Sequence, residues 1–187
     1  MIRLAPLLLL LLMASAPREV AAADWSMDPS GSRLEFIATF EKAAVPGTFT
    51  EFDTRVRLDP DKPSESRVDV TIVVTSADMK SADVNKAIRG PEWFDFQRFP
   101  QAEFHATDVR HTEANRYVAR GMLRLKGVER PVEVPFAWTE TTEAATMEGE
   151  ATVTRVAFGI GIGEWAATNV IGAEVHVKFK VTLHKRG

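Results

Sequence analysis

The sequence predicts an all-β protein: an eight-stranded antiparallel barrel with one short helix between strands 4 and 5. The main observation is a regular alternation of apolar and polar residues along most of the chain. This alternation is typical of strands with one buried and one exposed face. Short polar turns between the alternating segments favour antiparallel neighbours. A sandwich would fit the same pattern, but closing the sheet into a barrel removes its exposed edges.

The first alternating segment shows the pattern clearly. Leu34, Phe36, Ala38 and Phe40 share one parity, and Arg33, Glu35 and Thr39 lie on the other. The same criterion predicts eight strands, over residues 34–40, 52–58, 68–74, 102–109, 117–125, 132–138, 147–153 and 175–183.

Turn-forming sequences occupy residues 59–66, 111–116 and 139–146. Residues 81–89 carry helical spacing, with Ser81 as an N-cap and Gly90-Pro91 as the stop, so this segment predicts the single helix.

Residues 1–23 have the features of a secretory signal peptide. Arg3 precedes a leucine-rich apolar block, and small residues follow up to an A-x-A site at Ala23. The block is shorter than the ~20 residues that span a bilayer, which disfavours an uncleaved anchor. We therefore expect cleavage after Ala23, export to the periplasm, no stable membrane insertion afterwards, and one domain over residues 24–187.

Composition excludes several classes of function. The chain carries 23 basic and 26 acidic residues, and this balance lacks the basic surplus typical of nucleic-acid-binding proteins. It contains no cysteine, so disulfides, thiolate catalysis and cysteine-bound metals are all excluded. The fold must therefore be stabilised by packing.

The run FGIGIGEW at residues 158–165 places glycines on alternate positions. A dinucleotide-binding loop needs G-x-G-x-x-G followed by a helix, which this run lacks. If the run is extended, the bare face of Gly159 and Gly161 thins one wall of the barrel beside a ligand. A bend at a barrel corner is the alternative.

A second unusual segment, PEWFDFQRFPQAEF at residues 91–104, is rich in aromatic residues. It follows the predicted helix, so we expect it to fold over one end of the barrel. There it either anchors a loop to the core or lines an aromatic mouth for an apolar ligand.

In these segments the chain resembles the YceI-like family, secreted lipid- or polyisoprenoid-binding proteins of bacteria with a lipocalin-like barrel. The resemblance covers nearly all of the chain after residue 23. It depends on five segments: WSMDPSGSRLEF at 25–36, GTFTEFD at 47–53, WFDFQRFPQAEF at 93–104, YVARGMLRLKGVERPVEVPF at 117–136 and TRVAFGIG at 154–161.

The resemblance implies a non-catalytic barrel whose lumen holds an isoprenoid chain or a similar amphiphilic lipid, such as a polyprenyl phosphate, a quinone or a fatty acid amide. It implies no cofactor other than such a ligand, and it allows a homodimer. The family's opening strand often reads D..HS, whereas this chain has DPSGS at 28–32. Residues 164–173 look particular to a subgroup, so the head group is left open.

The candidate ligand-binding residues follow from these patterns. Those expected along the lumen are Phe36, Phe40, Phe104, Leu123, Trp138 and Phe158, and those expected at the mouth are Trp93, Phe94 and Trp165, beside Gly159 and Gly161. Taken singly, each is better explained as ordinary core than as a ligand contact. Arg155 has two interpretations: it binds a pyrophosphate or quinone oxygen, or it forms a structural ion pair with a carboxylate.

No catalytic or metal-binding pattern stands out. The four histidines, at 105, 111, 176 and 184, lack the spacing of H-E-x-x-H and fit a solvated surface. Neither G-x-S-x-G nor a paired-carboxylate site is present. Two alternatives to a lipid carrier stay open: a filled barrel with a structural or interaction role, and a lipocalin-like isomerase or hydrolase.

Overall fold

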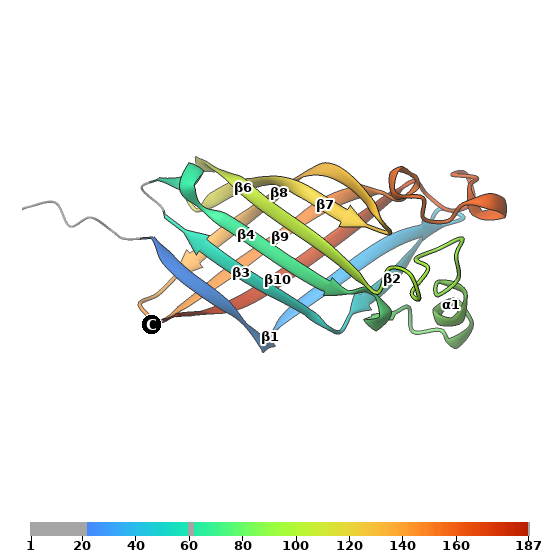
Figure 1. Cartoon of the computed structure of the whole chain (residues 1–187), viewed down its shortest axis with the longest axis horizontal. Coiled ribbons are helices and arrows are strands. Elements are labelled where there is room, and N and C mark those ends of the chain that lie inside the picture. The colour runs from blue at the N-terminus through green and yellow to red at the C-terminus, as the bar shows by residue number, and fades with distance from the viewer. Residues whose placement is uncertain (1–21, 60–61, 187) are drawn as a thin grey trace, which may run out of the picture.

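The structure is a computed structural model that describes residues 22–59 and 62–186. Eight antiparallel strands form a closed barrel, because the last strand pairs with the first (Figure 1). These strands are β1 (Ala23–Phe40), β3 (Phe52–Leu58), β4 (Arg67–Val73), β6 (Gln101–Glu113), β7 (Arg116–Leu125), β8 (Val128–Glu140), β9 (Ala144–Thr154) and β10 (Glu174–Lys185). The predicted barrel is confirmed. The predicted signal peptide, up to residue 21, lies outside the described residues.

Two further strands, β2 (Ala43–Phe49) and β5 (Ala77–Asp78), were not predicted. The start of β1 pairs with β3 only as far as Ser26, and from Leu34 onward β1 pairs with β2 instead. Strand β5 then pairs with the end of β2. Because β1 diverges from β3, it pairs with β3 at one end of the barrel and with β2 at the other. Pro46 and Gly47 interrupt the alternation of apolar and polar residues in β2, so the alternation did not predict this strand.

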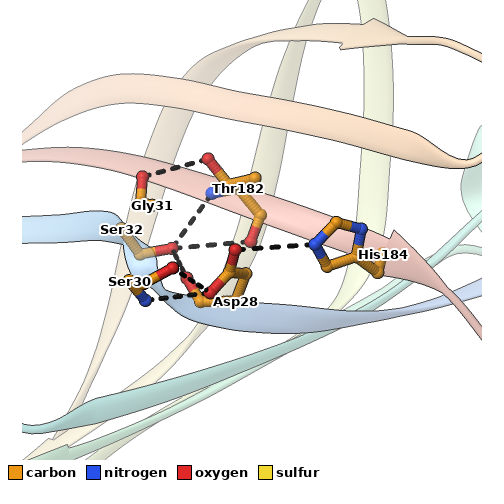
Figure 2. Close-up of polar contacts among 6 residues, drawn as sticks. All are labelled: Asp28, Ser30, Gly31, Ser32, Thr182 and His184. Carbon is orange, nitrogen blue, oxygen red and sulfur yellow. Dashed lines mark hydrogen bonds and ion pairs between the residues drawn. The ribbon is translucent and has the colours of Figure 1, made fainter.

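A bulge in β1 lies at the point of divergence. The register of β1 against β10 shifts between Asp28 and Arg33. Figure 2 shows the polar contacts that hold the bulge: the Asp28 carboxylate accepts hydrogen bonds from the backbone N–H of Ser30 (2.9 Å) and its hydroxyl (2.7 Å). These bonds lower the pKa of Asp28. Across the sheet, the Ser32 hydroxyl accepts the N–H of Thr182 (3.0 Å).

Besides the strands, residues 22–59 and 62–186 contain the helix α1 (Ala82–Ala87) and four 3-10 turns: η1 (Pro63–Glu65), η2 (Val74–Ser76), η3 (Arg155–Phe158) and η4 (Gly163–Trp165). Ser81 caps α1 as predicted, accepting the N–H of Val84. Counted along the chain, α1 comes between the third and fourth barrel strands, β4 and β6, which corrects the expected position by one strand.

The two ends of the barrel differ. Figure 1 shows α1 and the loop of residues 155–173 at one end, and the C-terminus at the other. We call the first the lid end and the second the closed end. At the closed end the rings of Trp25 and Trp138 meet edge to face at 5.6 Å, and Tyr117 stacks on Phe136. Leu58, Val109 and Leu183 are fully buried among them.

Candidate functional site

An apolar cavity lies inside the barrel toward the lid end. Its interior, taken as the space open to the centre of a water-sized sphere, is about 210 Å³. A single water needs only about 10–15 Å³ by that measure, so the cavity far exceeds a packing defect. Its wall takes inward residues from every barrel strand and from the lid loops. They are mostly aliphatic, as with Val70, Ile72, Val132, Val134, Val153, Val175 and Val177, with Leu34, Phe49, Phe52 and Phe179 among the larger ones.

The floor of the cavity is the top of the closed-end core. Thr54 on β3 is level with Val70 on β4, which is level with Phe104 on β6. One step further along the barrel, Val56 pairs with Trp25 of the closed-end core. The cavity is therefore blind at this end.

One side of the wall depends on a glycine. Phe36 on β1 lies directly opposite Gly47 on β2. A Cβ at Gly47 would lie 2.4 Å from the Phe36 ring and 2.6 Å from the sulfur of Met79. The bare backbone of Gly47 therefore lets both side chains reach the cavity wall.

Two loops form the roof. The first runs from Met79 to Pro100 and contributes Ile88, Trp93 and Phe94 to the wall. The second, residues 155–173, contributes Ile160 and Ile171. Backbone N–H groups of the second loop, at Gly161 and Ile162, donate to the carbonyl of Glu92 in the first at 2.8 and 3.0 Å.

The expectation that the glycine run thins a wall strand is wrong. Gly159, Gly161 and Gly163 all have positive φ, between 64° and 66°, and the segment forms two 3-10 turns in the lid. The alternative, a bend at the end of the barrel, describes it better. A Cβ at Gly161 would lie 2.4 Å from Nη1 of Arg155, so glycine is required there for close approach.

Arg155 organises the second lid loop. It is only 3% exposed, and its guanidinium donates to five backbone carbonyls at 2.7–3.0 Å. They belong to Ile160, Gly161, Trp165, Ile171 and Gly172. Burial lowers the pKa of Arg155. A guanidinium has five N–H groups, so all are engaged and none is left for a ligand. Neither expected role holds: Arg155 is structural, and its partners are carbonyls.

Lys126 joins the two lid loops and was not predicted. It sits in the tight turn between β7 and β8, and its ammonium donates to the carbonyls of Pro91 (2.7 Å) and Gly159 (2.6 Å). Burial is the main cause of the lowered pKa of Lys126. The Lys126-Gly127 turn is visible in the sequence, but the loops it contacts are distant along the chain.

The structure brings half of the predicted site residues to the cavity. Phe36, Trp93, Phe94, Phe104, Leu123 and Arg155 line it, whereas Phe40, Trp138, Phe158, Gly159, Gly161 and Trp165 do not. The six that do not line it are displaced for different reasons.

Phe40 ends β1 beyond the cavity, bridged to Ile171, and is 44% exposed. Trp138 belongs to the closed-end core, and Phe158 is buried outside the wall. Trp165 is half-buried and packs against Trp93, with ring centroids 5.9 Å apart.

The histidines do not form a reactive cluster. His105 and His111 are exposed, and His105 contacts Asp69 on the outer face of the sheet. Within residues 22–59 and 62–186, no group of three or more His, Cys, Asp and Glu residues could hold a metal. The same part of the chain contains no helix long and apolar enough to cross a bilayer.

Comparison with known protein families identifies the family to which this chain belongs. The family model for the YceI-like domain matches residues 25–183. The chain belongs to the YceI-like family. The resemblance noted from the sequence is therefore confirmed.

Similar proteins include a UPF0312 protein of Photorhabdus laumondii, 38% identical over 86 residues, which are 46% of this chain and 44% of that one. A UPF0312 protein of Shewanella oneidensis is 32% identical over 124 residues, 64% of each chain. The matched region thus spans less than two thirds of these relatives.

Solved structures share the fold. Burkholderia cenocepacia BcnA superimposes with a TM-score of 0.80 at 29% identity, covering 83% of this chain and 98% of that one. A polyisoprenoid-binding domain from Saccharophagus degradans has a TM-score of 0.68 at 13% identity, covering 87% and 98%.

The departure at the opening strand has a structural explanation. In the YceI-like pattern D..HS, the histidine position corresponds to Gly31 in DPSGS. A Cβ at Gly31 would lie 2.8 Å from the Thr182 hydroxyl, which donates to the Gly31 carbonyl at 3.0 Å. The side chain of Thr182 fills the space that a residue at position 31 would need. This site lies on the outside of the barrel (Figure 2), away from the cavity wall.

Proposed function

We propose that this protein is a non-catalytic carrier that holds the apolar chain of an isoprenoid or similar amphiphilic lipid inside the barrel. The observation that carries the proposal is the apolar cavity between the closed-end core and the lid. Pockets of this type, enclosed by a barrel and lined by aliphatic and aromatic side chains, suit an apolar ligand.

The energy of burial is sufficient for useful affinity. Each buried methylene contributes about 0.8 kcal/mol, so one five-carbon prenyl unit contributes roughly 3–4 kcal/mol. A few units reach about micromolar affinity after the cost of association. Because the wall recognises hydrocarbon by contact, we expect tolerance of different tails.

Membership of the YceI-like family and the likeness to a polyisoprenoid-binding domain support this ligand class. The signal-peptide pattern of residues 1–23 supports a periplasmic location. Such a carrier would take its lipid from a membrane and keep the tail out of water during transfer or storage.

The direct test is to isolate the protein from the cells that make it, extract it with organic solvent and analyse the extract by mass spectrometry. We expect a prenyl lipid or a comparable amphiphile in stoichiometric amount. A protein free of lipid that also fails to bind prenyl lipids would indicate a structural or interaction domain. Chemical conversion of an added lipid would instead indicate an enzyme.

A matched pair of variants ties binding to the cavity. Ala151 lines the cavity on β9, and Thr152 is exposed on the opposite face of the same strand. Ala151→Phe should fill the cavity and weaken lipid binding at least tenfold, whereas Thr152→Phe should leave it unchanged. Equal binding by both variants would show that the lipid sits elsewhere.

A further inference from the structure

The exposed apolar side chains of the described residues gather at one end of the barrel. Six large ones are at least 37% exposed: Phe40, Val84, Met122, Val156, Ile162 and Val170. Met122 lies on the barrel wall, in β7, and the other five belong to the lid end (Figure 1). Four of these five, at the tip of β1 and in the second lid loop, form what we call the apolar rim: Phe40, Val156, Ile162 and Val170. Single exposed apolar residues are ordinary on a protein surface, whereas a group at one end marks a contact surface.

The fold of the second lid loop holds the rim side chains outward. Val156 directly follows Arg155, and Ile162 and Val170 each adjoin a residue whose carbonyl accepts from its guanidinium, at 2.7 and 2.8 Å. The tip of β1 is tied to the same loop, because Phe40 forms a β-bridge to the residue that follows Val170. A loop anchored in this way cannot turn its exposed side chains inward without breaking those bonds.

Charge is nearly absent from this loop. Residues 156–173 contain one charged residue, Glu164, whereas the chain as a whole is 26% charged. The turn that joins β1 to β2 adds one acidic and one basic residue, Glu41 and Lys42. A surface without a surplus of either charge does not attract a charged partner over a distance. The rim is therefore suited to an apolar partner.

The rim is also continuous with the cavity wall. Ile171 lines the cavity and pairs with Phe40 of the rim. Trp93 lines the cavity as well, and its ring packs against that of Trp165. The backbone N–H of Trp165 donates to the carbonyl of Ile162 at 3.2 Å. An apolar path thus leads from the rim to the cavity, which is blind at the closed end.

We infer that the lid end docks reversibly on the surface of a lipid bilayer, with the rim side chains inserted just below the head groups. This inference rests on the proposed function, which makes a membrane the source or the acceptor of the ligand. Fluid hydrocarbon surrounds separate protruding side chains, whereas a stable protein interface needs a continuous packed area of about 1,200 Å² or more. Trp165, half-buried beside Ile162, is of the residue type enriched where membrane meets water. Because the contact is apolar, it does not require anionic lipid.

Vesicle flotation tests the docking. The protein is isolated from the cells that make it and mixed with vesicles of phosphatidylcholine, or of equal parts phosphatidylcholine and phosphatidylglycerol. The wild type is compared with Ile162→Ser and with the double variant Phe40→Ser/Ile162→Ser. Met122→Ser is the matched control, because Met122 is 44% exposed, as Phe40 is, but lies on the barrel wall. Every protein keeps the same N-terminus, so residues 1–23 affect all of them equally.

Tail binding is measured in parallel without vesicles, as displacement of the fluorophore N-phenyl-1-naphthylamine by farnesol. Sedimentation velocity records self-association. Neither Phe40 nor Ile162 lines the cavity, so an unchanged affinity for farnesol shows that the variants are folded and that their cavity is intact.

We expect the wild type and Met122→Ser to float with both kinds of vesicle. The affinity for vesicles should fall at least tenfold in the double variant and by less in Ile162→Ser, with farnesol binding unchanged, because the lost contacts are with hydrocarbon of the bilayer.

Four results would overturn the docking and leave the carrier function intact: a wild type that binds farnesol but no vesicles, a double variant that floats like the wild type, an equal loss in Met122→Ser, or binding only to vesicles with phosphatidylglycerol. Self-association that the double variant abolishes, without vesicle binding, would likewise overturn it and assign the rim to a second copy of this chain. Failure of the wild type to bind farnesol would overturn the carrier function, whatever the vesicles show.

Discussion

The closed end and the lid end of the barrel are built from the same alternating strands, but one is solid and the other hollow. At the closed end, large rings from neighbouring strands meet across the axis, as with Trp25 and Trp138. Toward the lid end many inward positions carry valine or isoleucine among the phenylalanines, and β1 leaves β3 to pair with β2. The short aliphatic side chains in that part of the barrel do not meet at the axis.

The two ends also differ in what stabilises them. The closed end depends on buried apolar area. The lid loops have little regular structure and are held by cations on backbone carbonyls, Arg155 within one loop and Lys126 between two. This difference predicts that changes at the closed end alter global stability, whereas changes at the lid act locally and on ligand binding.

The largest effect should come from Trp138→Ala. This change removes a ring that is only 5% exposed and its contact with Trp25, and we expect a loss of about 3–5 kcal/mol in the free energy of unfolding. Urea denaturation measures it. Trp165→Ala, at the half-buried lid position, is the matched control, and we expect a loss of about 1–2 kcal/mol. Equal losses at both sites would contradict the division into two ends.

The next largest effect should come from Arg155→Lys, for which we expect the free energy of unfolding to fall by about 3 kcal/mol. Lysine has three donors on one nitrogen and cannot reach five carbonyls arranged around a planar guanidinium. Hydrogen exchange should accelerate at the amides of Ile160 and Gly161 and remain slow in the barrel strands. Arg120→Lys, in an exposed ion pair with Glu133, should cost no more than about 0.5 kcal/mol. Uniform acceleration across the strands would mean that the lid is not a local unit.

Gly161→Ala and Gly159→Ala separate close packing from backbone strain. Both positions have positive φ, which costs an alanine about 1 kcal/mol. At Gly161 the new Cβ would also meet Arg155 and Trp93, whereas at Gly159 nothing lies within 4 Å. We therefore expect the free energy of unfolding to fall by about 2–3 kcal/mol in Gly161→Ala and by about 1 kcal/mol in Gly159→Ala, measured by thermal unfolding. The reverse order would refute the described packing of the lid.

The smallest expected effect is on the pH dependence of stability in acid. Hydrogen bonds from the Lys80 side chain, then from Asn85, hold the pKa of Asp78 well below its ordinary value of 3.8. Because the pKa is lowered on folding, the stabilisation is fully present above 3.8 and is lost as the pH falls further toward the folded value.

Asp78→Asn should therefore flatten the dependence of the unfolding temperature on pH between about 2 and 4. Lys80→Met should flatten it partly. A pH dependence unchanged in Asp78→Asn would show that this carboxylate contributes nothing to acid unfolding.

Alternation was enough to predict the strands and their inward faces, because the parity of a residue states which face of the sheet it occupies. The choice of a barrel over a sandwich depended on the removal of exposed sheet edges. Alternation located all eight barrel strands, and turn chemistry located α1 and its cap at Ser81. It missed β2, where Pro46 and Gly47 interrupt the pattern, and the brief β5. Parity also marks Val175, Val177 and Phe179 as inward, so these wall residues could have been proposed from the sequence.

The sequence by itself determined the eight barrel strands, their inward faces and the family. Only the tertiary structure decided which inward residues fill the barrel and which surround a cavity, because parity gives the side of a sheet but not the depth along the barrel axis. It alone also decided the role of Arg155, whose carbonyl partners are brought within reach by the folding of one loop. The burial of the Trp93 indole nitrogen at the lid end is likewise decided by the tertiary structure, since burial is set by neighbours that lie far apart along the chain.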